Sequence, residues 1–126
     1  MKKRIDNKPW GREEIFVVNK KVSVKIINVD KRKRLSLQKH KYRNEFWRFL
    51  DNDVKVTLGN KIIKARKGDE LFIKKGTLHR IEGLSKDANI LEISFGNFNE
   101  NDIERIEDDF GRVKWGDIDE RHKTIN

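Results

Sequence analysis

The sequence predicts an all-β domain, a sandwich or barrel built from short strands. Apolar and polar residues alternate with a period of two through most of residues 14 to 95, as expected for strands that bury one face. Turn signals separate these runs at short intervals, and Gly59-Asn60 is a two-residue hairpin signal, because both residues tolerate positive φ. This spacing favours a sandwich or barrel over a parallel α/β sheet.

The alternation predicts strands and then a change of character. Strands are expected near Glu14–Val18, Val22–Asn28, Leu35–His40, Glu45–Leu50, Val54–Leu58, Lys61–Ala65, Glu70–Ile73, His79–Glu82 and Asn89–Phe95. The segment 99–107 begins with residues typical of a helix cap and places Ile103 and Ile106 at helical spacing. It therefore predicts a short C-terminal helix.

Length and composition indicate a single domain. The chain has 126 residues, of which 35% are hydrophobic and 40% charged, so its core must be compact. We expect that core within about residues 8–112, followed by a polar tail over 113–126. The sequence has no cysteine, which excludes disulfides, thiolate metal sites and a thiol nucleophile. It has neither a long apolar span nor a secretory signal, so a cytoplasmic location is expected.

The net charge of +9 raises the question of an anionic partner. Most lysines alternate with apolar residues, as in 22–27 and 54–58, which predicts solvated outer faces of strands. The densest basic run, 31–34, is short and has no aromatic residue beside it, so nucleic acid is a weak alternative. A small phosphorylated substrate would also suit a basic mouth.

Four polar residues share one face of the strand expected over 35–40 and its approach. In extended chain, alternate side chains point the same way, which places Arg34, Ser36, Gln38 and His40 in one file. Such a file is unusual unless that face lines a site.

Two further residues complete a candidate metal site with Gln38 and His40. Glu45 returns from the next strand, and His79 follows a segment punctuated by glycines at 68 and 76. Nitrogen and oxygen ligands without sulfur suit one divalent ion, for which we expect zinc, with Mn, Fe, Co or Ni as alternatives. A single histidine is more often an ordinary polar residue, but the joint spacing favours the metal site. Trp47 shares the strand parity of Glu45 and is expected in the core behind this site.

The two segments resemble the paired motifs of cupins, which are double-stranded β-helix or jelly-roll barrels. The match is closest to type II phosphomannose isomerases, often the C-terminal half of a bifunctional mannose-1-phosphate guanylyltransferase. The resemblance covers roughly residues 8 to 112, in five blocks: 8–11, 34–40, 43–47, 76–80 and 102–112. The chain departs from the family where Gln38, Lys74 and Asn52 replace a common histidine, proline and glycine, and where Phe110 replaces a tyrosine.

The resemblance implies a metal-dependent isomerase that converts mannose 6-phosphate to fructose 6-phosphate. It implies that Arg43 and Arg105 add positive charge at the enediolate or the phosphate, and that Arg34, Ser36 and Arg112 contact the substrate. For each arginine the alternative is a surface salt bridge, for instance to Glu104 or Asp108. The proton-transferring base stays open among Glu107, Asp109 and a hydroxide on the metal.

Other functions on the same barrel stay open. A nucleotide-sugar ketoisomerase or epimerase would need a wider mouth lined by aromatic residues. A non-catalytic sugar-binding cupin would keep the metal without turnover, and the Phe110 departure is compatible with it. The chain shows no glycine-rich nucleotide loop, so the resemblance extends only to the isomerase half. RNA binding ranks last. The expected partners are a small phosphorylated sugar and a second copy in a homodimer, with no membrane.

Overall fold

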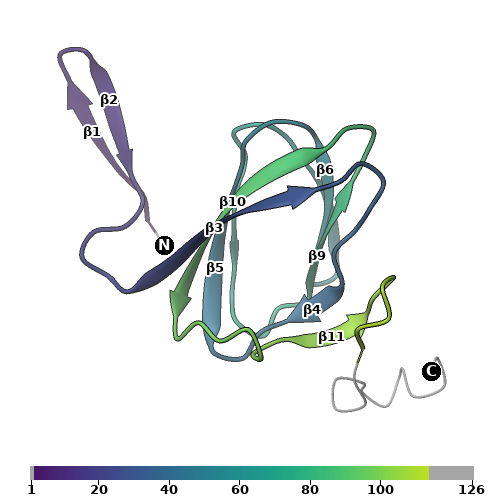
Figure 1. Ribbon diagram of the computed structural model, residues 1–126. Coiled ribbons are helices and arrows are strands. Elements are labelled where there is room, and N and C mark those ends of the chain that lie inside the picture. The colour runs from purple at the N-terminus through teal and green to yellow at the C-terminus, as the bar shows by residue number, and fades with distance from the viewer. Residues whose placement is uncertain (1, 114–126) are drawn as a thin grey trace.

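The computed structural model describes residues 2–113, and these form strands and connecting turns (Figure 1). The strands are β1 (Arg4–Lys8), β2 (Gly11–Ile15), β3 (Val22–Val29), β4 (Leu37–Lys39), β5 (Arg43–Phe49), β6 (Val54–Leu58), β7 (Lys61–Ala65), β8 (Glu70–Ile73), β9 (His79–Gly83), β10 (Ala88–Gly96) and β11 (Glu104–Glu107). The predicted polar tail lies outside this range except for Val113. No helix able to cross a membrane occurs within residues 2–113.

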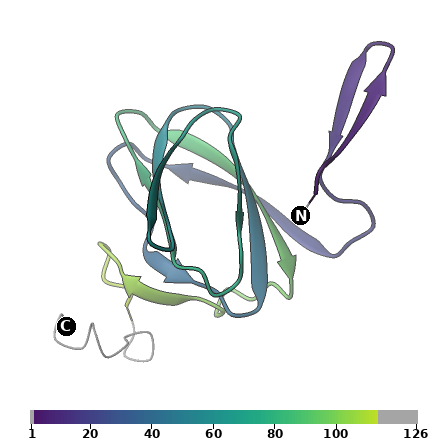
Figure 2. The ribbon, with the colours of Figure 1, turned by 180° about the vertical axis from the view of Figure 1, so that it is seen from behind.

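Two sheets face each other and enclose the core, and a separate hairpin extends from them (Figures 1 and 2). The first sheet has the strand order β3-β10-β5-β8, and the second has the order β11-β4-β9-β6-β7. The hairpin β1–β2 pairs only with itself and projects away from the barrel. The prediction of an all-β domain is therefore confirmed.

The hairpin predicted at Gly59-Asn60 is present. It joins β6 to β7, and Leu58 lies opposite Lys61 at its base. Gly59 has a φ of 60°, whereas Asn60 is not among the residues with positive φ. A glycine with positive φ at the first central position is typical of a type II′ turn. Only Gly59, and not Asn60, therefore adopts the positive φ that the sequence allows at both positions.

The barrel interior is apolar at one end and polar at the other. Residues that face each other across β5 and β10 show the change: Phe49 lies opposite Ile90, Trp47 opposite Glu92, and Glu45 opposite Ser94. The apolar end forms the core, with members from seven strands, namely Val29, Trp47, Phe49, Val54, Val56, Ala65, Ile73, Ile81, Ala88 and Ile90. The polar end holds the candidate site.

The helix predicted over 99–107 is wrong: residues 99–103 form a turn and irregular chain, and Glu104–Glu107 form β11. Arg105 lies opposite Gln38 and Glu104 opposite Lys39, so β11 supplies the hydrogen-bonding edge partner of β4. Ile106 is buried between two half-buried neighbours, which is strand alternation. One apolar pair at helical spacing is weak evidence, and an unpaired strand edge is the stronger constraint.

The N-terminal strands and Lys25 also differ from what the sequence predicts. The first expected strand, 14–18, forms earlier as β2, and β1 was not predicted. Lys25 was expected on an outer face with the other lysines, but its ammonium lies 3.2 Å from the buried carboxylate of Glu92. Consequently Val24 and Ile26 lie on the outer face of β3, 61% and 47% exposed.

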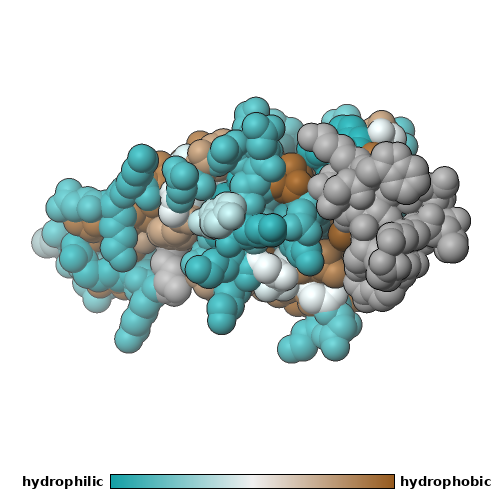
Figure 3. Space-filling view, turned by 90° about the horizontal axis from the view of Figure 1, so that it is seen from below, coloured by the Kyte–Doolittle hydropathy of each residue, from teal (hydrophilic) through white to brown (hydrophobic). Residues whose placement is uncertain are grey.

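On the face seen in Figure 3, hydrophilic side chains predominate with hydrophobic ones between them.

The core assignment can be tested with two isoleucines on the second sheet. Ile81 on β9 is fully buried, whereas Ile62 on β7 is 65% exposed. We expect Ile81→Ala to lower the free energy of unfolding by about 2–5 kcal/mol, because it leaves a cavity, and Ile62→Ala to change it by less than about 0.5 kcal/mol. Urea unfolding followed by circular dichroism measures both, and equal losses would contradict the described core.

Candidate metal centre

Three of the four predicted ligands converge at the polar end of the barrel. His40, Glu45 and His79 each offer one ligand atom, and these atoms all lie within 4.8 Å of one another. His40 Nε2 is 3.4 Å from Glu45 Oε2, and His79 Nε2 is 3.7 Å from Glu45 Oε1. All three residues are at most 3% exposed. This group could hold a metal ion.

Backbone carbonyls hold the two imidazoles so that the same nitrogen of each faces Glu45. His40 Nδ1 lies 2.6 Å from the carbonyl oxygen of Asp102, and His79 Nδ1 lies 2.8 Å from that of Thr77. A carbonyl only accepts, so each Nδ1 carries the proton and each Nε2 keeps its lone pair. This is the arrangement by which an outer hydrogen bond orients a metal-ligating histidine.

The chain around His40 is fixed from two further directions. The carbonyl oxygen of His40 accepts a 2.7 Å hydrogen bond from the backbone N–H of Gly76, whose φ of 83° favours glycine. The carboxylate of Asp102 accepts the backbone N–H groups of Lys41 and Tyr42 at 2.8 and 3.0 Å. Residues far apart in the sequence thus hold the turn between β4 and β5.

The protonation and hydrogen bonding of the group fit a divalent cation. Burial lowers the pKa of His79 to about 4 and also lowers the pKa of His40, so both imidazoles are neutral at neutral pH. Glu45 Oε1 and His79 Nε2 are buried and have no hydrogen-bond partner. Unpaired buried acceptors are costly, and a cation placed between them would satisfy both.

Arg43 lies against two of the three ligands. Its Nε donates to Glu45 Oε2 at 3.1 Å, and its Nη2 lies 3.3 Å from His40 Nε2. Its guanidinium also donates to the carbonyl oxygen of Asn99 and stacks over the ring of Phe98 at 4.7 Å. The side chain is 5% exposed, so its position is set by these contacts.

A cavity of about 290 Å³ lies beside this group, and five predicted residues reach it. The predicted members are Ser36, Gln38, Arg43, Arg105 and Arg112. The side chain of Gln38 lies on the same sheet face as that of His79, because the two residues are paired across β4 and β9. Its Oε1 accepts a 2.6 Å hydrogen bond from Ser36 Oγ. Gln38 as fourth ligand stays a prediction.

Arg34 is the predicted site residue that lies elsewhere. Its guanidinium forms a bidentate ion pair with Asp109, with N–O distances of 2.7 and 2.8 Å. Arg34 lines a separate hollow together with Phe110. The polar file therefore holds from Ser36 to His40 and fails at Arg34, whose guanidinium is held by Asp109. Arg112 lines both hollows and is paired with Asp108 at 2.8 Å, the surface pair considered above.

Five residues of the cavity wall were not predicted as site residues: Lys25, Leu35, Phe98, Glu100 and Ile103. Phe98 and Glu100 belong to a segment without alternation, which gave no signal. Lys25 shares strand parity with Ile27 and Val29, which pack inward, but Val24 and Ile26 make the opposite face equally apolar, so this pattern did not identify it either. The prediction that Trp47 lies in the core behind the site is confirmed, because it is 1% exposed and its ring lies 5.5 Å from that of His79.

Comparison with known proteins gives concordant matches. Residues 2–108 match the sequence family described as "Mannose-6-phosphate isomerase C-terminal". The alginate biosynthesis protein AlgA of Pseudomonas aeruginosa is 33% identical over 108 residues, which cover 84% of this chain and 22% of AlgA. The xanthan biosynthesis protein XanB of Xanthomonas campestris pv. campestris (strain B100) is 31% identical over 108 residues, covering 84% of this chain and 23% of XanB. The chain thus spans less than a quarter of the length of these relatives.

The fold is also found among solved structures. A conserved Klebsiella pneumoniae protein with a double-stranded β-helix domain superposes with a TM-score of 0.61 at 15% identity, covering 68% of this chain and 75% of that protein. The predicted cupin barrel is therefore confirmed.

The metal site can be tested by metal content. Wild-type protein is expected to retain about one divalent ion per chain after dialysis, and His79→Ala to lose most of it, because three buried side chains must converge to hold it. Arg34→Ala, outside the cavity, is the control and should retain the ion. Elemental analysis and calorimetric titration with Zn²⁺ and Mn²⁺ measure this, and equal occupancy in His79→Ala would contradict the site.

Proposed function

This chain belongs to the mannose-6-phosphate isomerase C-terminal family, and on that basis we propose that it is a metal-dependent sugar-phosphate isomerase acting on mannose 6-phosphate. The observation that carries the proposal is the convergence of His40, Glu45 and His79 beside a small cavity lined by cations. The ligand group could hold a metal ion, and the positive charge of the cavity wall suits a phosphorylated sugar.

The proposed reaction moves one proton between neighbouring carbons. In the open-chain aldehyde of mannose 6-phosphate, a base removes the proton on C2, and the electron pair moves to the oxygen on C1 to give an enediolate. A proton is returned to C1 while the proton of the C2 hydroxyl moves to the oxygen on C1, which gives the ketone of fructose 6-phosphate with a hydroxyl on C1. Catalysis therefore requires stabilisation of negative charge on O1 and O2 and a group that carries the proton.

The ligand group and Arg43 would stabilise the enediolate. His40, Glu45 and His79 would hold a divalent ion, with Gln38 as a fourth ligand, and the bound ion would supply Lewis-acid stabilisation of the developing oxyanion. Arg43 contributes a planar, permanently charged donor on the cavity wall beside these ligands.

Arg105 is the best candidate for the phosphate. Of the four cations in the cavity wall, Lys25 pairs with Glu92, Arg43 with Glu45, and Arg112 with Asp108. Within residues 2–113, Arg105 forms no ion pair, and its Nε is buried without a hydrogen-bond partner. A phosphate oxygen would satisfy that donor, and Arg112 lies in the same wall to share the charge. Arg34 is paired with Asp109 outside this cavity, so a phosphate bound in the cavity would not contact it.

The carboxylates considered for proton transfer are engaged elsewhere. Glu107 lies 3.3 Å from Arg80, and Asp109 pairs with Arg34. Glu100 is the carboxylate among the described residues of the cavity wall, and we propose it as the base in their place.

The cavity volume favours a sugar phosphate over a nucleotide sugar. At about 290 Å³ the cavity lies at the lower limit of typical ligand sites, roughly 300–1,000 Å³. Phe98 is the aromatic residue among the lining residues, so a stacked platform for a nucleobase is not built by this wall.

The role of Arg105 can be tested by binding. Wild-type protein is expected to bind mannose 6-phosphate with an affinity that falls with salt, and mannose far more weakly. Arg105→Met should lower the affinity for mannose 6-phosphate by roughly tenfold to a hundredfold, because one charge-assisted contact of about 1.5–3 kcal/mol is lost. The affinity for mannose should not change. Calorimetry at two salt concentrations measures this, with Arg34→Met as a matched control outside the cavity. Equal affinities for mannose and its phosphate would remove the phosphate from the proposal.

The role of Arg43 can be tested by kinetics. Arg43→Lys keeps the charge and loses the planar donors, and we expect kcat to fall about a hundredfold with little change in KM, because the contact strengthens as the enediolate forms. In deuterated water the wild type should incorporate deuterium at C1 or C2 of the sugar, which nuclear magnetic resonance would detect. If metal-loaded wild type neither converts mannose 6-phosphate nor exchanges its hydrogen, a non-catalytic sugar-binding cupin takes the place of the isomerase.

A further inference from the structure

The hairpin β1–β2 forms an arm whose tip carries an exposed tryptophan. The turn between the two strands presents Trp10, which is 72% exposed, and the arm extends away from the barrel (Figures 1 and 2). The arm lies within the residues that match the family, 2–108, so it is part of the domain. An isolated two-stranded hairpin is marginally stable in water, which makes an arm without a partner unexpected.

The base of the arm is anchored, so its direction is set. Glu14 accepts from Lys3 at 2.7 Å and from Arg48 at 3.1 Å, and both cations also reach Glu70. Just beyond β2, the ring of Phe16 packs on that of Phe46 at 5.4 Å. These contacts hold the arm at the edge of the first sheet and leave its tip free.

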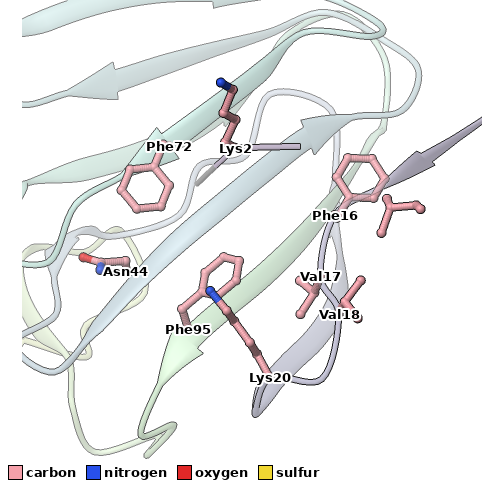
Figure 4. A pocket seen from close by; sticks show the side chains of 9 residues that line it. Lys2, Phe16, Val17, Val18, Lys20, Asn44, Phe72 and Phe95 are labelled. Carbon is pink, nitrogen blue, oxygen red and sulfur yellow. The ribbon is translucent and has the colours of Figure 1, made fainter. Parts of the chain in front are cut away.

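A groove lies at the base of the same arm. Its volume is about 410 Å³, and its wall includes Phe16, Val17, Phe72 and Phe95, with Lys2 and Lys20 beside them (Figure 4). Phe72 is 42% exposed although it is a large aromatic residue. An aromatic groove flanked by ammonium groups suits an indole ring, which packs against the aromatic walls and attracts cations to its face.

Trp10 cannot reach the groove of its own chain. Ile15 at the far end of β2 lines the groove, and Trp10 precedes β2 at its near end. Five residues of extended strand at roughly 3.3 Å each separate the two by about 16 Å. The tryptophan and the groove that suits it can therefore meet only between two molecules.

We propose that this chain forms a reciprocal dimer in which Trp10 of each copy enters the groove of the other. Exchange of the same two elements in both directions closes the assembly with two-fold symmetry. The groove continues into the apolar outer face of β3, since Phe95 lies opposite Val22 and the next outward residues are Val24 and Ile26. The arm of the second copy, crossing this face, would cover the apolar side chains that the single chain leaves exposed.

The oligomeric state of matched variants tests the dimer. Sedimentation equilibrium of the wild type is expected to give a discrete dimer. Trp10→Ala should raise the dissociation constant by at least about thirtyfold, the effect of one interface hot spot. Ile62→Ala removes a side chain of similar exposure, 65%, from the outer face of the other sheet and should leave the dimer unchanged. A monomeric wild type at about 100 μM, an open polymer, or a Trp10→Ala variant that dimerises normally would overturn the proposal.

Mixing two defective variants tests the pairing of tryptophan and groove. Phe72→Glu places a charge in the groove and leaves Trp10 intact, so it too should dimerise poorly by itself. A mixture of Trp10→Ala and Phe72→Glu retains one intact tryptophan–groove contact per heterodimer. We therefore expect a heterodimer tighter than either variant's homodimer, measured with one variant fluorescently labelled. No gain on mixing, with both variants folded by circular dichroism, would overturn the assignment of Trp10 to the groove.

Discussion

The candidate site depends on two histidines whose Nδ1 protons are committed to backbone carbonyls. Because Asp102 and Thr77 accept these protons, the Nε2 lone pairs of His40 and His79 are directed at Glu45. Burial keeps both rings neutral, which preserves those lone pairs at neutral pH. The backbone N–H of Gly76, which donates to the carbonyl oxygen of His40, fixes the chain that carries one of these rings.

Such a group is costly to bury, and the barrel offsets the cost in two ways. Charges at the polar end are paired, with Arg43 on Glu45 and Lys25 on Glu92, and Trp47 Nε1 donates to Glu92 at 3.2 Å. Burial still raises the pKa of Glu92, so its desolvation is incompletely compensated. The apolar end supplies the stability, because its residues are packed from both sheets. Trp47 lies at the boundary, where its ring contacts Phe49 on one side and His79 on the other.

Sequence reasoning succeeded where a pattern was local and failed where the fold decided. Alternation located most strands of the barrel, and the spacing of His40, Glu45 and His79 identified residues that do converge. The segment 99–107 was misread because its conformation is imposed by the open edge of β4, which no local pattern reveals. Lys25 was misread because both faces of β3 are apolar in sequence, so periodicity does not say which face is inside.

The ambiguity of β3 has a physical origin that links the site to the outer surface. In a strand with one solvent-exposed face, apolar and polar residues alternate. In contrast, β3, β10 and β5 also carry apolar residues on their outer face, where Ile93 lies opposite both Val24 and Phe46. On β5, Glu45 points into the barrel and Phe46 points out, where it meets Phe16 at the base of the arm. The strand that carries the acidic ligand is therefore packed on both faces. A second copy on the outer face of this sheet would not touch the cavity, because Glu45 faces the interior of the barrel. The proposed dimer would thus use the outer face of the first sheet and the candidate metal centre its inner face, a division that follows from the period of two with which strand side chains alternate.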